Sequence, residues 1–175
     1  MLQLTGTSNG TSNNFSSVIL NVDGSCHGTP VRTGFGGVLH NDAGLFLAGF
    51  SDFIPGSDDI LLGELSAIYH GLIMAKDLGY VELACYSDSL AWTNLINGPI
   101  ERYHIYVVFI QDIKQMLQQT NVMVSHTLRE GNHCADYMAK LGVSSDVELL
   151  RHDVPPAGLV NLLSSDAADT LLLRK

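Results

Sequence analysis

Short apolar runs bounded by turn-forming residues dominate the first third of the chain and return twice later, a pattern typical of β-strands. The strands that we predict from these runs cover residues 18–23, 33–40, 44–51, 81–87 and 122–128. The second and third of them flank Asn41-Asp-Ala-Gly44, a sequence that favours a tight turn. We therefore expect those two strands to form a hairpin.

Helical periodicity takes over after the hairpin. Leu61, Leu65, Ile68, Leu72 and Ala75 recur at spacings of three and four, which predicts a helix over 61–78 that ends at Gly79. Further helices are predicted over 89–96, 103–119 and 132–141. The resulting order, βββαβααβα, predicts a mixed α/β fold with a five-stranded mixed sheet flanked by helices.

The two ends of the chain lack this regular pattern. Residues 1–17 are rich in Thr, Ser, Asn and Gly and carry no charge, so we expect a disordered leader. One domain is then predicted over 18–143, and residues 144–175 form a C-terminal extension with a Pro155-Pro156 pair and short leucine runs. The sequence leaves open whether this extension packs on the domain or binds a partner.

Composition narrows the class of protein. The hydrophobic content of 46% is ample for one core, and no apolar stretch has the roughly 18–20 residues of a membrane span. Three cysteines without a CxxC pair and the lack of a signal peptide favour a reduced, intracellular protein, which we expect to be a monomer. A net charge of −9 without a basic run argues against nucleic-acid binding by charge alone.

Four acidic residues stand where the predicted elements would bring carboxylates together. Asp23 ends the first strand, Asp88 ends the fourth, Glu64 lies on the apolar stripe of the helix over 61–78, and Asp136 lies in the last helix. Carboxylates that converge repel one another unless a cation lies between them. Ligands that are all oxygen suit Mg²⁺ or Mn²⁺, and two such ions can activate a water and stabilise the leaving oxygen of a phosphodiester.

Each of these acidic residues also has a structural alternative. The alternatives are a turn cap for Asp23, a buried salt bridge for Glu64, a helix N-cap for Asp88 and an exposed i,i+4 pair with Lys140 for Asp136. Other chemistry is disfavoured, because the chain has no zinc-finger spacing, no P-loop and no nucleophile-elbow sequence.

The element order and a set of short motifs resemble type 1 ribonuclease H. The motifs are Asn21-Val-Asp-Gly-Ser25, Gly34-Phe-Gly-Gly-Val38, Gly63-Glu-Leu-Ser-Ala67, Ser87-Asp-Ser89 and Asn132-His-Cys-Ala-Asp136. The segment His126-Thr-Leu-Arg-Glu-Gly-Asn132 and the residues after it are similar to the plant ribonuclease H-like domains derived from non-LTR retrotransposons. The resemblance covers roughly residues 18–142.

This resemblance implies an endonuclease that hydrolyses the RNA strand of RNA/DNA hybrids. It implies that Asp23, Glu64, Asp88 and Asp136 hold two Mg²⁺ ions, with Mn²⁺ as the alternative, and that the domain can belong to a larger reverse-transcriptase-like polypeptide. It also implies that His126, ten residues before the last carboxylate, assists proton transfer or product release. A histidine inside the fifth strand would instead be structural, and His133 is then the second candidate.

The resemblance further predicts contacts with nucleic acid. The residues concerned are Gly24, Ser25, Ser89, Arg129 and Asn132. For Ser25 and Ser89 the alternative is ordinary turn and cap chemistry. Residues 100–119 contain only Arg102 and Lys114 as basic residues, so the basic protrusion of some bacterial members is not visible. This departure favours a second hypothesis, a catalytically weak domesticated domain that binds nucleic acid or protein, whereas the four carboxylates favour the nuclease.

Overall fold

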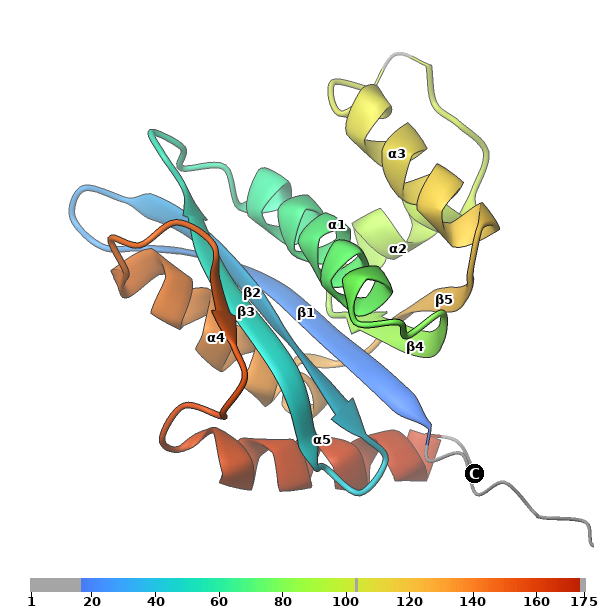
Figure 1. Ribbon diagram of the computed structural model, residues 1–175. Coiled ribbons are helices and arrows are strands. Elements are labelled where there is room, and N and C mark those ends of the chain that lie inside the picture. The colour runs from blue at the N-terminus through green and yellow to red at the C-terminus, as the bar shows by residue number, and fades with distance from the viewer. Residues whose placement is uncertain (1–16, 103, 174–175) are drawn as a thin grey trace, which may run out of the picture.

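A single mixed β-sheet organises the computed structural model, which describes residues 17–102 and 104–173 (Figure 1). Its strands are β1 (Val18–His27), β2 (Arg32–Asn41), β3 (Phe46–Ile54), β4 (Glu82–Ser87), β5 (Asn121–His126) and β6 (Leu150–His152), in the spatial order β5-β4-β1-β2-β3-β6. β1 pairs antiparallel with β2 and parallel with β4, with Val22 opposite Ser87. The carboxyl end of β4 therefore lies beside Val22, whereas β1 continues to His27. Asp23 thus lies within β1, paired with Gly36, and not at the end of the strand as predicted.

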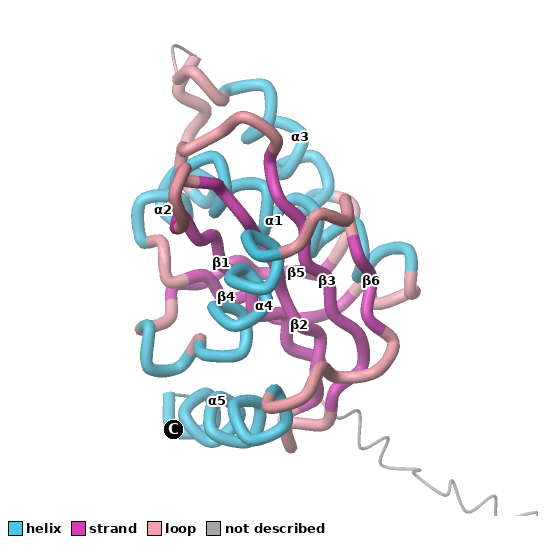
Figure 2. The backbone as a smooth tube through the Cα atoms, turned by 90° about the vertical axis from the view of Figure 1, so that its left-hand side faces the viewer, coloured by secondary structure: helices cyan, strands magenta, loops and turns pink. Residues whose placement is uncertain are grey.

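Helices cover both faces of the sheet. They are α1 (Ile60–Asp77), α2 (Leu90–Asn97), α3 (Val107–Gln118), α4 (His133–Ser144) and α5 (Leu159–Leu173), and a 3₁₀ turn, η1 (Arg129–Gly131), precedes α4. Figure 1 shows α1 and α4 on opposite sides of the sheet, and Figure 2 shows α4 in front of the strands with α5 running below it. Since side chains alternate along a strand, Leu39 packs in the core under α1 and its neighbour Val38 packs with α4 and α5.

The N-terminal part of α1 lies directly against the second half of β1. Asp59 caps the helix by accepting hydrogen bonds from the backbone N–H groups of Leu61 and Leu62, and the Tyr106 hydroxyl donates to Asp59 from the other side. A Cβ atom on Gly24 would lie 2.5 Å from the backbone nitrogen of Glu64, so the close approach requires glycine there. This contact places Glu64 next to Asp23, the residue before Gly24 on β1.

The predicted mixed α/β class and the predicted element order up to α4 are confirmed, with three corrections besides the longer β1. The sheet has six strands instead of five, because β6 pairs with β3 in antiparallel fashion. The helix predicted over 103–119 begins at Val107, after a segment of turns. Leu61 belongs to the apolar spacing that predicted α1, but it is 48% exposed, and its backbone oxygen accepts a hydrogen bond from the Trp92 indole.

The C-terminal segment packs on the domain through β6 and α5. Leu159 and Leu163 of α5 are buried in the cluster that also contains Cys134 and Met138 of α4. The predicted leader lies outside the described residues, except for Ser17. None of the helices in the described ranges is both long enough and apolar enough to cross a membrane.

Candidate active site

Three of the four predicted carboxylates meet at one point above the sheet. Each of Asp23, Glu64 and Asp88 offers a carboxylate oxygen, and these three atoms all lie within 4.8 Å of one another. The parallel pairing of β1 with β4 brings Asp23 and Asp88 together, and the contact of α1 with Gly24 adds Glu64. Oxygen ligands at this spacing fit a hard divalent cation, and zinc would prefer nitrogen or sulfur.

Asp136 completes the acidic cluster from the opposite side. It lies in the first turn of α4 and lines the same cleft, which has a volume of about 500 Å³. The cleft also contains four of the residues predicted to contact nucleic acid: Gly24, Ser25, Arg129 and Asn132. The structure thus brings all four predicted carboxylates together from β1, α1, the end of β4 and α4.

Burial and repulsion between carboxylates raise the pKa of two members of the cluster, Asp23 and Glu64. Asp23 is only 7% exposed, and burial followed by the charges of Asp88 and Asp136 raises its pKa to about 8. The Gly24 amide, which donates to Asp23 at 2.9 Å, opposes this shift. Burial likewise raises the pKa of Glu64. A bound cation would remove the repulsion, so this site favours cation binding.

Two basic side chains already approach the acids. The Arg129 guanidinium lies 3.6 Å from Asp88, and the Lys140 ammonium lies 2.8 Å from Asp136. The i,i+4 pair considered for Asp136 therefore exists, although Asp136 still lines the cleft. Both cations are largely exposed, and such pairs contribute roughly 0–1 kcal/mol, so neither would hold its acid against a divalent ion.

The structure does not bring His126 to the acidic cleft. This residue is the last of β5, where it pairs with Ser87, and it lines a separate hollow between β5 and the helices α2 and α3. His133, the first residue of α4, lines the cleft instead. The chain turns through η1 between the two histidines, which separates them in space.

Ser89 and Asn132 are buried and serve the scaffold of the site. The Ser89 hydroxyl accepts a hydrogen bond from the Trp92 amide, capping α2, and donates one to Glu64, which opposes the rise in the Glu64 pKa. Asn132 is 1% exposed, and its amide donates to the backbone oxygen of Val22. Ser89 is not among the residues that line the cleft.

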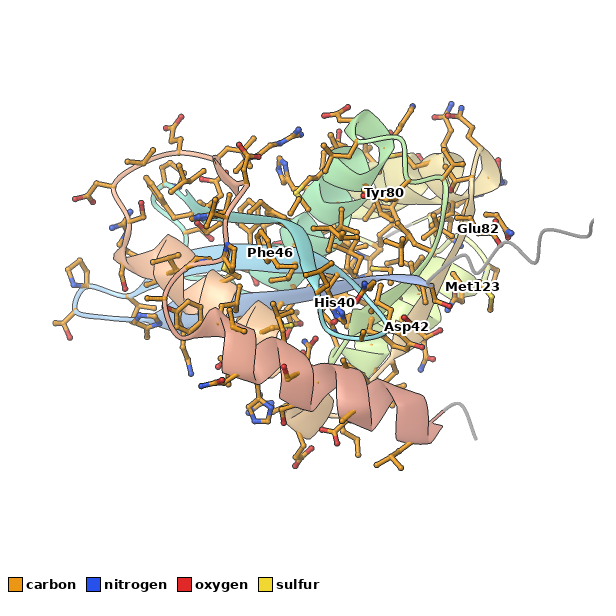
Figure 3. All side chains as sticks on the ribbon, turned by 60° about the horizontal axis from the view of Figure 1, so that its bottom comes forward. His40, Asp42, Phe46, Tyr80, Glu82 and Met123 are labelled. Atoms are coloured by element: carbon orange, nitrogen blue, oxygen red, sulfur yellow. The ribbon has the colours of Figure 1, made fainter. Side chains whose placement is uncertain are left out.

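Sequence reasoning missed a buried polar chain behind the carboxylates. The Asn21 side chain donates to Asn132 at 2.9 Å, and its oxygen lies 2.6 Å from Nε2 of His40. Figure 3 labels His40 on β2, next to α5. Buried polar groups are costly unless they are hydrogen-bonded, so these linked side chains fix the start of α4 against β1. The available signal was a polar residue, Asn21, inside the apolar run that leads to Asp23.

The raised pKa of Asp23 predicts a metal effect that grows with pH. Its pKa of about 8 exceeds the ordinary value of 3.8, so between these values the folded state binds more protons than the unfolded state. The unfolding free energy of the metal-free protein therefore falls as pH rises towards 8. At pH 6 the cation must displace a proton from Asp23, whereas near pH 8 a large part of Asp23 is already ionised. We therefore expect Mg²⁺ to raise the melting temperature more at pH 8 than at pH 6. Melts with and without Mg²⁺ at both values test this, and equal shifts would contradict it.

Comparisons with known proteins agree with this architecture. A protein of Arabidopsis thaliana named putative ribonuclease H protein is 30% identical over 152 residues, which are 85% of this chain and 24% of that protein. The chain thus spans about a quarter of the length of this curated relative.

Two solved structures share the fold. The N-terminal RNase H domain of Rv2228c from Mycobacterium tuberculosis has a TM-score of 0.65 at 23% identity, over 74% of this chain and 94% of that chain. LC11-RNase H1, isolated from compost by a metagenomic approach, was solved with an RNA/DNA hybrid. It has a TM-score of 0.64 at 19% identity, over 73% of this chain and 97% of that chain.

The family comparison covers the whole of the acidic site. The model of the family described as reverse transcriptase-like matches residues 21–142, from the strand before Asp23 to the glycine that follows Asp136 on α4. The helices and strands that lie wholly or partly outside this match are β1 at its start, α4 at its end, β6 and α5. The chain therefore belongs to the reverse transcriptase-like family and contains a ribonuclease H-like domain.

Proposed function

We propose that this domain is an endonuclease that hydrolyses the RNA strand of RNA/DNA hybrids with two divalent ions, Mg²⁺ or Mn²⁺. The observation that supports it most is the meeting of Asp23, Glu64 and Asp88 within 4.8 Å, with Asp136 in the same cleft. Four carboxylates around one cleft repel one another, and a bound cation relieves that repulsion. LC11-RNase H1, which has the same fold and was solved with a hybrid, supports the choice of substrate.

The chain's own residues would divide the work as follows. The four carboxylates would hold the ions, which when bound supply an activated water and charge stabilisation at the leaving oxygen. Arg129 is 91% exposed in its side chain and lies at the cleft, where it can leave Asp88 and contact a phosphate. His133, half exposed at the same cleft, would take the proton-transfer role that the resemblance implies for His126.

The direct test uses a labelled RNA/DNA hybrid with Mg²⁺ or Mn²⁺ and the variant Asp88→Asn. We expect metal-dependent cleavage of the RNA strand, reduced by roughly 100-fold in the variant, which is about 2.7 kcal/mol of transition-state stabilisation. The variant should fold normally, because Ser89 and not Asp88 caps α2. Single-stranded RNA, double-stranded RNA and the matched DNA duplex serve as substrate controls.

A binding domain without catalysis is the second candidate, and the scarcity of positive charge favours it. Among the residues that line the cleft, only Arg129 and Lys140 are basic apart from His133. Weak, salt-sensitive affinity for nucleic acid is expected from so few cations. A folded wild-type chain that retains hybrid in a filter-binding assay and cleaves none of it would favour this candidate over the nuclease.

A further inference from the structure

Helix α4 has no N-cap hydrogen bond from the residue at its own N-terminus. Asn132 stands at the N-cap position, where asparagine usually accepts a hydrogen bond from the first turn. Its side chain makes no such bond, because it is hydrogen-bonded to Asn21 and to the backbone oxygen of Val22. The first backbone N–H groups of α4 therefore need acceptors from elsewhere.

Asp166 of α5 supplies these acceptors. One of its carboxylate oxygens accepts from the His133 amide at 3.1 Å, and the other accepts from the Cys134 amide at 2.8 Å. The carboxyl group is 0% exposed, a costly position for an acid unless hydrogen bonds and positive charge surround it. The positive end of the α4 dipole provides part of that charge. Asp166 thus caps the start of α4 from α5, 33 residues after His133 and 32 after Cys134.

The same carboxylate also approaches the ring of His133. Nδ1 of His133 lies 3.4 Å from the Asp166 oxygen that accepts the His133 amide. The ring is half exposed and lines the acidic cleft. An acid on one ring nitrogen restricts the rotation of the imidazole and favours a proton on that nitrogen. Asp166 therefore influences a side chain of the cleft without reaching the cleft itself.

The first turn of α4 is consequently held from two sides. Asn132 ties it to β1 through Asn21 and Val22, and Asp166 ties it to α5. Asp136 lies in this turn, three residues after His133, so its carboxylate takes its position from both attachments. Small displacements of a ligand are costly in a metal site, where geometry must hold to about half an ångström.

We propose that Asp166 is a positioning residue of the acidic site, acting through the first turn of α4 and the ring of His133. The segment with β6 and α5 is then a working part of the nuclease and not an appended tail. This inference rests on the proposed function. It predicts that removing the charge of Asp166 weakens metal binding and lowers kcat, while KM for the hybrid stays unchanged, because Asp166 has no access to the nucleic acid.

The test compares full-length wild type, Asp166→Asn, Asp169→Asn and Leu163→Ala. Asp169→Asn makes the same chemical change one turn further along α5, and Leu163→Ala removes buried packing from α5 without touching the cap. Mn²⁺ affinity is measured by calorimetry, and kcat and KM on a hybrid are measured at a temperature where thermal melts find every variant folded. Should Asp166→Asn not fold, Asp166→Ser keeps one oxygen acceptor and takes its place.

We expect Asp166→Asn to lose roughly tenfold in kcat and several-fold in Mn²⁺ affinity with KM unchanged, as removal of a cap that also orients a side chain would predict. Asp169→Asn should match wild type, and Leu163→Ala should melt earlier while keeping Mn²⁺ affinity and kcat. Equal Mn²⁺ affinity and kcat in wild type and Asp166→Asn, with wild type active, would overturn the inference alone. An inert wild type that binds no Mn²⁺ would overturn the proposed function and this inference together.

Discussion

Replacing Asp23 with asparagine should abolish cleavage and at the same time stabilise the metal-free protein. Asp23 is the acid whose pKa responds to the charges of all three others, Glu64, Asp88 and Asp136, so it is central to any bound cation. We expect activity to fall by about 1,000-fold, or about 4 kcal/mol of transition-state stabilisation. The unfolding free energy of the metal-free protein should rise by on the order of 2 kcal/mol at neutral pH. Burying the Asp23 carboxyl group requires it to stay protonated, and asparagine has no such cost.

Two measurements check this pair of opposite effects. Hybrid cleavage gives the loss of activity, and chemical denaturation in EDTA gives the gain in unfolding free energy. Asp153→Asn removes an exposed carboxylate just after β6 and should change neither quantity. An Asp23→Asn protein that is less stable than wild type in EDTA would mean that Asp23 is a turn-capping residue, the alternative that the sequence leaves open.

Gly142→Ala should destabilise the protein strongly, although helix propensity predicts the reverse. Alanine in place of glycine inside a helix is ordinarily favourable by about 1 kcal/mol. A Cβ atom on Gly142, however, would lie 2.2 Å from the backbone oxygen of Asp52 on β3, and backbone cannot move aside cheaply. We expect α4 to be pushed from the sheet, at a cost of about 3 kcal/mol or more.

Urea denaturation of Gly142→Ala measures this cost. Ser144→Ala makes a change of similar size on the exposed side of the same helix. Its unfolding free energy should stay within about 0.5 kcal/mol of wild type. Because α4 carries Asp136, Mg²⁺ should also stabilise Gly142→Ala less than it stabilises wild type. A variant as stable as wild type would show that the contact between α4 and β3 relaxes easily.

Local pattern sufficed for much of the fold. The apolar run before Asp23 predicted the start of β1, although the strand continues to His27. The three-and-four spacing from Leu61 to Ala75 predicted α1 to within a residue at each end. Strand and helix periods are properties of neighbouring residues, so they can be read without tertiary contacts. The short β6 and the helix α5 were not predicted from the sequence. A strand of three residues is too short to show a period, and leucine runs do not specify one face of a helix.

The candidate site divides in the same way. Asp23, Glu64 and Asp88 could be selected from the sequence, because an acid that directly follows an apolar run or lies on an apolar stripe is conspicuous in its local context. That they meet depends on the pairing of β1 with β4, which are separated by β2, β3 and α1. The sequence also favoured His126 over His133, since spacing along the chain does not give the path of the turn between β5 and α4.

The sequence by itself determined the strand and helix periods and the acidic character of the site. The tertiary structure decided which distant groups touch: the glycines that allow α1 and α4 to approach the sheet, the buried chain from His40 to Asn132, and the cap that Asp166 places on α4. The physical reason is range. Propensity and periodicity act over a few residues, whereas these contacts join segments that only the completed packing of both sheet faces brings within hydrogen-bonding distance.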